Sequence, residues 1–411
     1  MNLLLIHQFF LEKDDGGGSR FNEMTRVWAE KGHTITVIAG MVHYASGVKN
    51  KKYRWKWTRR EHIAYGIEVI RCYVYHGYNT SFTGRLWAYL SFVCSGIYAG
   101  VFKARGKFDV ILVTSPPLFV GWTAYVLSRL KRIPFVFEVR DLWPESAIDT
   151  GVLQNKWLIR MSFWLEKFVY RKAKRINVLT PAFREKLIRE KSVPPEKIFF
   201  VPNGADFTLS DHLLTSFERD AFRAQLGFTG KKVILYVGAH GVANHLIQVL
   251  DTAAYIQKDM PEILFALVGE GMEKAMLKEN AAARSLVNVR FFDSVPKREI
   301  FNYILASDFG LSVLKRVETF RTVYSNKTFD YMACKKPIFM LIDGVSRDLV
   351  EAAGCGVYAE PENKEDFASK IKFFAAMSQE ELNKIGENGY RHAKTHFDRT
   401  RLAEEYLKHL A

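Results

Sequence analysis

The sequence predicts an α/β protein built from two Rossmann-like domains that face each other across a cleft. Short apolar runs alternate with helix-length segments along the chain, and this rhythm restarts after residue 230. Most of the apolar runs are nearly continuous, as expected for strands that are buried on both faces of a parallel sheet. The length of 411 residues also exceeds that of one typical domain.

The first half of the chain carries seven strand signals, separated by turns and by helix patterns such as Phe21–Lys31 and Trp157–Lys174. The predicted strands are Leu3–His7, Thr34–Ala39, Val69–Tyr75, Val110–Thr114, Phe135–Glu138, Arg175–Leu179 and Ile198–Val201. The stretch Asn203–Lys232 has few strand signals and contains an Asn-Gly turn, so we interpret it as the linker.

The second half repeats the pattern, with a helix predicted at Asn244–Lys258. Its predicted strands are Val233–Val237, Ile263–Val268, Val289–Phe292, Phe309–Val313 and Ile338–Leu341. The final helical stretch, Gln379–Leu410, is long enough to leave the second sheet and pack elsewhere. We therefore expect an N-terminal domain of residues 1–205, joined by the C-terminal helix 390–411, and a C-terminal domain of residues 206–389.

The positive charge of the chain lies in its first half. Residues 1–200 contain 32 Lys and Arg against 16 Asp and Glu, whereas the remaining residues contain 27 and 28. This asymmetry indicates an anionic partner for the first half: a membrane surface, nucleic acid or a phosphorylated substrate. The most basic segment, Lys49–Arg60, holds seven cations and three aromatic residues. Its Lys52, Arg54, Trp55 and Trp57 would suit an anionic membrane interface, with nucleic acid as the second interpretation.

Two features bear on the location of the protein. Its four cysteines are widely separated and form no C-x-x-C pair, which is typical of a reduced, intracellular protein. The run Leu3–Ile6 is too short for the core of an export signal. The run Leu86–Phe102 has no charge, but it contains Ser and Gly and has little margin in length, so we expect a buried or interfacial helix rather than a membrane span.

Several turns that follow predicted strands could carry chemistry, because ligands of open α/β sheets bind beyond the carboxyl ends of the strands. Glycines that permit close backbone approach stand at Gly16–Gly18, at Gly238 and Gly241, and at Gly269 and Gly271. Lys327 and Asp330, three residues apart, would share one helical face and could offer a cation to a diphosphate and a carboxylate to a ribose diol. The segment Glu138–Glu145 holds carboxylates and an arginine suited to acid–base and orienting roles. A plain flexible loop at the glycines and surface ion pairs at the charged residues remain the alternative interpretations.

Taken together, these motifs resemble those of retaining glycosyltransferases of family 4, which have the GT-B fold, and most closely the bacterial branch that builds O-antigen, capsule and exopolysaccharide. The motifs that carry the resemblance are Gly16–Gly18, Glu30–Val37, Thr114–Pro117, Arg140–Ser146, Val201–Asp206, Gly269–Gly271 and Asn326–Pro337. The resemblance implies a nucleotide-sugar site in the C-terminal domain and an acceptor site in the N-terminal domain.

The resemblance also implies roles for single residues. Asp330 would hold the ribose hydroxyls in place of the usual glutamate, Gly17 would approach the donor phosphates, and Asp141 would contact the acceptor hydroxyl. Family members often carry an Arg and a Lys just after the strand equivalent to Val233–Val237, where this chain has Gly238–His245, so the phosphate charge must be met by other residues, of which Lys327, Arg321, Arg316 and His240 are candidates. Thr322 stands where the family has its first acid and cannot carry that role. The expected donor-binding set is Gly17, Gly238, His240, Gly269, Gly271, Arg321, Lys327 and Asp330. The expected acceptor and membrane set is Arg20, Glu145, Lys52, Arg54, Trp55 and Trp57, and the expected catalytic residues are Asp141 and Lys327.

The function expected from this resemblance is transfer of a sugar, with retention, from a UDP-linked or other nucleotide-diphosphate donor to a polyprenyl-diphosphate-linked or other glycan acceptor. We expect a cytoplasmic protein, peripheral on the inner face of the cell membrane, without a metal ion or a cofactor other than its donor substrate. Two alternatives remain open: a sugar-nucleotide epimerase of GT-B fold, and a basic nucleic-acid-binding α/β protein.

Overall fold

The computed structural model describes residues 1–12, 15, 20–42, 47, 49–77 and 82–410. The chain forms two compact units, of which the second is mainly Asn203–Arg399 and the first comprises the described residues up to Pro202, apart from Asp15, together with residues 400–410. The expected return of residues 390–411 to the first unit therefore needs correction, because only the residues from Thr400 onward belong there.

The first unit is built on an eight-stranded sheet with the order β3-β4-β2-β1-β5-β6-β7-β8. Its strands are β1 Asn2–Ile6, β2 Thr34–Gly40, β3 Thr58–Ala64, β4 Ile67–Cys72, β5 Val110–Thr114, β6 Phe135–Val139, β7 Arg175–Val178 and β8 Ile198–Phe200. All neighbours pair in parallel except β3, an antiparallel edge strand beside β4. β3 was not predicted, because its solvent-exposed charges do not resemble those of a buried parallel strand.

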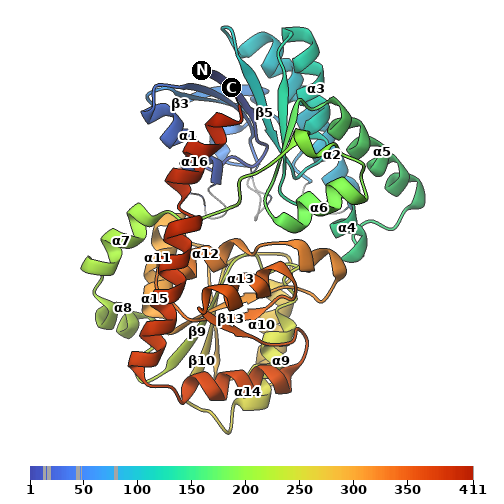
Figure 1. The fold of residues 1–411 in the computed structure, drawn as a ribbon. Helices are drawn as coiled ribbons and strands as arrows, with labels where there is room; N and C mark the ends of the chain where they lie inside the picture. The colour runs from blue at the N-terminus through green and yellow to red at the C-terminus, as the bar shows by residue number, and fades with distance from the viewer. Residues whose placement is uncertain (13–14, 16–19, 43–46, 48, 78–81, 411) are drawn as a thin grey trace. The chain divides into compact units, whose positions relative to one another are not determined.

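Helices cover both faces of this sheet (Figure 1). They are α1 Arg20–Glu30, α2 Phe82–Tyr98, α3 Val120–Lys131, α4 Glu145–Asp149, α5 Lys156–Lys172, α6 Pro181–Arg189 and α16 Arg399–Lys408, with a π-helical turn at Ala99–Lys103. One core forms where α1 packs on the sheet through Phe21, Met24 and Trp28. The Trp28 indole N–H donates to the carbonyl oxygen of Ala403 at 2.8 Å, which attaches α16 to this core.

A buried ion pair closes the carboxyl edge of the first sheet. Arg20 at the start of α1 and Glu138 on β6 are 2% and 0% exposed, and their side chains approach to 3.2 Å. The Arg20 guanidinium also donates to the carbonyl oxygens of Val201, at 2.9 Å, and Pro202. Asn177 on β7 donates to the same Glu138 carboxylate at 2.9 Å. Arg20 therefore joins segments that are far apart in the sequence, and its burial contradicts the expected contact with a membrane, whereas its acceptor role stays a prediction.

The second unit is built on a parallel sheet with the order β11-β10-β9-β12-β13-β14. Its strands are β9 Lys232–Val237, β10 Ile263–Val268, β11 Val289–Phe292, β12 Phe309–Val313, β13 Ile338–Leu341 and β14 Gly356–Tyr358. Its helices are α7 Phe207–Ser216, α8 Arg219–Leu226, α9 Ile247–Ile256, α10 Lys274–Ala283, α11 Lys297–Ala306, α12 Asn326–Ala333, α13 Val345–Ala353, α14 Lys364–Ala375 and α15 Gln379–His396. The strand order reverses between β9 and β12, which is where open α/β sheets bind ligands.

Two expectations for the second unit need correction. The stretch Asn203–Lys232 is not an irregular linker, because it folds into α7 and α8, which pack against the sheet-covering helix α11. The terminal stretch Gln379–Leu410 is two helices, which end and restart around Phe397 and Asp398. Apolar side chains in α7 and α15 join one core of this unit, whereas α9 and α14 cover the opposite face.

The ion pair between Arg20 and Glu138 predicts a large cost for its disruption. Arg20→Met should lower the free energy of unfolding by about 3–5 kcal/mol, because it leaves the Glu138 carboxylate buried without its counter-ion. Urea unfolding of the variant measures this cost. The matched control is Arg26→Met on the same helix, where the exposed pair with Glu30 contributes only about 0–1 kcal/mol. Equal losses in the two variants would contradict the assigned role.

Candidate functional site

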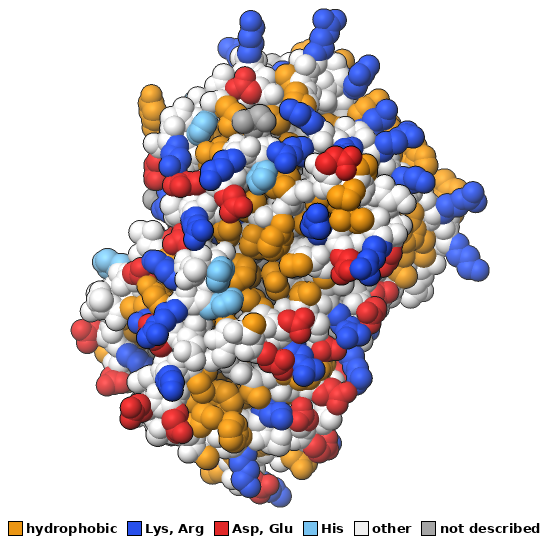
Figure 2. All heavy atoms as spheres, viewed as in Figure 1, with side chains coloured by type: hydrophobic (Ala, Val, Ile, Leu, Met, Phe, Trp, Pro, Cys, Tyr) orange, Lys and Arg blue, Asp and Glu red, His pale blue; other side chains and the backbone are white. Residues whose placement is uncertain are grey.

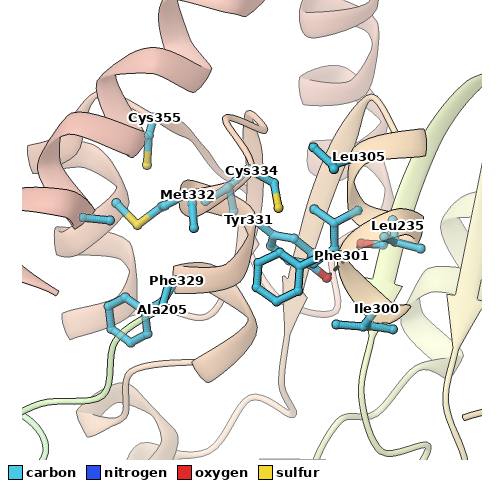
Figure 3. Close-up of a cluster of buried hydrophobic side chains, with 14 of the residues drawn as sticks. Ala205, Leu235, Ile300, Phe301, Leu305, Phe329, Tyr331, Met332, Cys334 and Cys355 are labelled. Carbon is cyan, nitrogen blue, oxygen red and sulfur yellow. Dashed lines mark hydrogen bonds between the residues drawn. The ribbon is translucent and has the colours of Figure 1, made fainter. Parts of the chain in front are cut away.

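The two central strands of the second sheet separate at their carboxyl ends. β9 pairs with β10 along its whole length, but it pairs with β12 only at Ile234 and Leu235. The hydroxyl group of Tyr331, on α12, fills the gap (Figure 3). Its oxygen lies 3.0 Å and 3.2 Å from the carbonyl oxygens of Leu235 and Leu311, and it accepts the N–H of Val237 at 3.1 Å. The separated strands are thus held apart without loss of backbone hydrogen bonds.

Glycines permit this arrangement and the loops beside it. A Cβ on Gly310 of β12 would lie 2.3 Å from the Tyr331 ring, so a side chain there would displace the ring. A Cβ on Gly269 would lie 1.8 Å from the carbonyl oxygen of Gly238, and one on Gly271 would lie 2.3 Å from that of His240. The turns after β9 and β10 therefore pack backbone against backbone. Gly269 and Gly271 are explained by this contact between loops, where the sequence analysis expected close approach of a ligand.

Lys327 is the cation at this strand edge. It stands in the first turn of α12, and its Cε lies 3.3 Å from where a Cβ on Gly238 would be. Its Nζ lies 4.9 Å from the ring centroid of Tyr236 and donates to Ser325 Oγ at 3.4 Å. Among the described residues, no carboxylate forms an ion pair with Lys327. Burial lowers the pKa of Lys327 to about 8, and the nearby Asp330 opposes this shift only in part.

Asp330 lies one turn further along α12, as the spacing predicted. Its Oδ2 accepts a hydrogen bond from Nζ of Lys297, at the start of α11, at a distance of 2.5 Å. The Asp330 side chain keeps 14% of its surface exposed. A ligand diol that used this carboxylate would have to share it with Lys297 or displace Lys297. The sequence analysis did not single out Lys297.

His240 does not provide the positive charge expected of it. The side chain is fully buried, and neither ring nitrogen has a hydrogen-bond partner among the described residues. Burial and the neighbouring Lys274 and Lys278 lower the pKa of His240 to about 4, so the imidazole is neutral at pH 7. In the ligand-free chain it is therefore not a cation, although a neutral ring can still donate one N–H.

Two further residues of the predicted donor set are Arg321 and Gly17. Arg321 is half exposed and forms ion pairs with Glu318, at 3.3 Å, and Asp343, at 3.2 Å. These carboxylates raise the pKa of Arg321. Gly17 lies outside the described residues, so its predicted role stays a prediction. Of the predicted set, the structure brings Gly238 against Gly269 and His240 against Gly271, and it places Lys327 beside Gly238.

In the first unit, Asp141 follows β6 and accepts a hydrogen bond from Ser146 Oγ at 2.8 Å. Burial raises the pKa of Asp141, with a smaller contribution from Glu145. Glu145 is bound by the ammonium of Lys191, which also approaches Glu166 to 2.9 Å. The pKa of Glu166 rises to about 7, first through burial and then through Glu145. Asp141 therefore stands beside a buried group of charges on the carboxyl side of β6.

The basic segment between β2 and β3 keeps part of the predicted surface. Lys52 forms ion pairs with Glu12, at 2.6 Å, and Glu61, at 3.2 Å, so its charge is largely compensated. Trp55 is 90% exposed, and the Arg54 guanidinium lies 5.6 Å from its ring. A pocket of about 690 Å³ is lined by Lys49, Asn50, Lys51, Arg54, Trp55, Lys56, Trp57 and Tyr73. Arg54, Trp55 and Trp57 thus remain available to a partner, whereas Lys52 is engaged.

Tyr331 is the main site residue that sequence reasoning missed. Its position four residues before the Lys335-Lys336-Pro337 sequence is typical of an ordinary core aromatic residue. The one available signal was Gly310 in a strand, because glycine inside a strand often marks close approach of another group. Tyr236, whose ring lies beside Lys327, was also missed, because it too is typical of an ordinary core aromatic residue.

Replacing the Tyr331 hydroxyl tests whether it holds β9 and β12 apart. Tyr331→Phe should cost about 1–3 kcal/mol, because the Val237 N–H loses its partner. Hydrogen exchange of the segment 232–238 should become faster, as read by mass spectrometry. Tyr303→Phe is the control, since its half-buried ring lies in the same unit at 5.7 Å from Phe292. An unchanged hydrogen-exchange rate in Tyr331→Phe would show that the hydroxyl does not hold β9 and β12 apart.

Comparisons with known proteins agree with this geometry. Residues 15–204 match the family described as "Glycosyl transferase 4-like domain", and residues 218–392 match "Glycosyl transferases group 1". WcaI of Escherichia coli strain K12, described as a colanic acid biosynthesis glycosyl transferase, is 28% identical over 67% of this chain and 68% of its own length. WbjE of Pseudomonas aeruginosa, described as a glycosyltransferase, is 25% identical over 62% of each chain.

Solved structures show the same fold. Sucrose-phosphate synthase from Thermosynechococcus elongatus superposes with a TM-score of 0.75, at 16% identity, over 99% of this chain and 97% of its own. HepE of Anabaena, in complex with UDP and glucose, gives a TM-score of 0.71, at 16% identity, over 100% of this chain and 99% of its own. The predicted fold class and family resemblance are confirmed. The chain belongs to the group 1, family 4 glycosyltransferases of GT-B fold.

Proposed function

We propose that this glycosyltransferase moves a sugar, with retention of configuration, from a UDP-sugar to a lipid-linked glycan acceptor during synthesis of a cell-surface polysaccharide. The named function of WcaI in colanic acid biosynthesis supports the polysaccharide product. The UDP complex of HepE, a protein of the same fold, supports the donor. The lipid-linked acceptor is supported by the excess of cations in residues 1–200.

The observation that carries the proposal is the position of Lys327. A partly buried ammonium without a carboxylate partner among the described residues stands at the point where the strand order of the second sheet reverses. The helix that carries it begins at Asn326 after a Ser325 whose side chain does not cap the first turn. A helix N-terminus that its Ser325 side chain does not cap, together with a cation, favours a diphosphate. In the reaction they would stabilise the charge that develops on the leaving nucleoside diphosphate.

Asp330 and Asp141 have separate roles in this proposal. Asp330, exposed in part on the same helix as Lys327, would hold the ribose hydroxyls in competition with Lys297. Asp141 belongs to the acceptor side. Because burial raises its pKa, it can accept a hydrogen bond from an acceptor hydroxyl and take up its proton more readily than an exposed carboxylate could.

The proposed location is the cytoplasmic face of the cell membrane, with peripheral attachment through the first unit. Arg54, Trp55 and Trp57 surround a pocket with several further cations, which suits the phosphates of a lipid-linked acceptor. Neither a metal ion nor a further cofactor enters the proposal.

The pH dependence of UDP binding tests the role of Lys327. The ammonium is needed for the diphosphate, so affinity should fall as the pH rises through about 8, the value to which burial lowers the pKa of Lys327. The fall should approach about tenfold per pH unit well above the pKa, while UDP stays ionised because a phosphate group has a second pKa of about 6. Isothermal titration calorimetry between pH 7 and 9.5 measures it.

The matched variant is Lys327→Arg, because a guanidinium keeps its charge throughout this range. Its UDP affinity should be independent of pH even if the affinity itself is lower. Lys327→Met should bind weakly at every pH. Parallel pH profiles in the wild type and Lys327→Arg would refute the assignment of the titrating group to Lys327.

Analogues of the ribose test the role of Asp330. Asp330→Ala should weaken UDP binding by about 10–100-fold, the loss expected for hydrogen bonds to a charged acceptor. Binding of 2′,3′-dideoxy-UDP, which lacks both hydroxyls, should be almost unaffected by the same change. Asp259→Ala, on the exposed loop before β10, serves as the control. Equal weakening for both nucleotides would mean that Asp330 does not contact the diol.

A further inference from the structure

Three helices on one face of the first sheet expose large apolar side chains. Along α2 and the π-helical turn that follows it, a stripe with spacings of one to four residues runs through exposed Trp87, Leu90, Cys94, Tyr98, Val101 and Phe102. Trp87 and Phe102 are 63% and 66% exposed. The stripe belongs to Thr83–Lys103, the one helix among the described residues that is long and apolar enough to cross a membrane.

The other face of this helix is fixed to the protein. Ser95 Oγ donates to the carbonyl oxygen of Tyr73 at 2.7 Å, and Ser91 Oγ accepts the N–H of Tyr75 at 2.8 Å. Gly100 leaves space for Leu127 of α3, since a Cβ on this glycine would lie 2.3 Å from Leu127 Cδ1. The helix is therefore part of the layer that covers the sheet, and it presents the stripe without leaving that layer.

The apolar surface continues onto the neighbouring helices α3 and α5. α3 packs against both α2 and α5. Trp122 of α3 and Trp164 of α5 both approach Phe168, with ring centroids at 5.3 Å and 5.6 Å. Trp157, at the start of α5, is also exposed. Together, the stripe, Trp122, Trp157 and Trp164 form what we call the helical face.

The charges of the helical face all have one sign at the surface. The Lys and Arg residues of these helices are Arg85, Lys103, Arg129, Lys131, Lys156, Arg160, Lys167, Arg171 and Lys172. Within the same helices the acidic residue is Glu166, which is only 2% exposed and bound by Lys191. Figure 2 shows blue Lys and Arg side chains beside orange apolar ones where Figure 1 places α3 and α5. The face therefore complements an anionic surface.

We propose that the helical face is the surface through which this protein lies on an anionic lipid bilayer, with α2 parallel to the membrane plane. Indole and phenol rings favour headgroup depth, and cations attract anionic lipids. Leu90, Val101 and Leu130 offer nothing to the phosphates or bases of a nucleic acid, but they gain from the acyl boundary. The inference rests on the membrane attachment proposed above and gives it a surface different from the segment around Trp55.

Cys94 allows a direct test, because it is the exposed cysteine of the stripe while Cys72, Cys334 and Cys355 are buried. Burial also raises the pKa of each of these three thiols, so an environment-sensitive NBD maleimide should label Cys94 selectively. With vesicles of phosphatidylcholine and 30% phosphatidylglycerol, the NBD emission should shift to the blue, and brominated lipids should quench it. Pure phosphatidylcholine vesicles should give a much smaller change.

A variant series completes the test. The triple variant W87S/Y98S/F102S should bind the anionic vesicles at least about tenfold more weakly in flotation, because it loses the apolar contacts. The control Y255S/F373S, which alters exposed rings of the second unit, should float like the wild type. UDP-induced stabilisation should be the same in all of these proteins, so loss of lipid binding and loss of the donor site can be told apart.

Three outcomes would overturn the proposal. One is flotation of the triple variant at wild-type level, and another is flotation without any change at Cys94, which would place the contact at the segment around Arg54 and Trp55. The third is absence of vesicle binding together with either concentration-dependent dimers or oligo(dT) binding that the triple variant lacks.

Discussion

The buried ion pair between Arg20 and Glu138 fixes the carboxyl edge of the first sheet. The Glu138 carboxylate on β6 pairs with the Arg20 guanidinium of α1 and accepts a hydrogen bond from the Asn177 amide on β7. The same guanidinium holds the carbonyl oxygen of Val201, where the chain leaves the first unit. Because each charge would be costly to bury alone, these segments must keep one arrangement. Asp141 follows Glu138 by three residues, so the same contacts fix the position of its backbone.

At the carboxyl edge of the second sheet, a neutral group fixes the arrangement of the strands. The Tyr331 hydroxyl satisfies the backbone where β9 and β12 separate, and it needs no counter-ion. Lys327, one helical turn earlier, is left as a cation whose burial is offset only in part by the nearby Asp330 carboxylate. The free protein therefore carries an electrostatic cost at this position. The diphosphate of the proposed donor would reduce that cost, and part of its affinity would then come from compensating the buried charge.

Local patterns predicted the sheets well and the charged residues poorly, for a physical reason. A parallel strand is recognisable from its own apolar run, as at Ile263–Val268, which matches β10 in full. The role of a charge depends on partners far away in sequence. Arg20 and Glu138 are 118 residues apart, so the sequence could not show that Arg20 is buried. His240 was expected to be a cation because a histidine side chain can carry a positive charge, but burial lowers its pKa and makes it neutral at pH 7.

Charge density along a chain also differs from charge density in space. Lys49–Arg60 is the most basic segment of the sequence, yet Lys52 is neutralised by Glu12 and Glu61 once the chain folds. The cations of α2, α3 and α5 are spread over residues 85–172 and attract no attention in the sequence. Folding brings those helices side by side and buries their one acid, Glu166. Packing thus gathers these cations on one face, and the proposed bilayer is a surface wide enough to meet three helices at once.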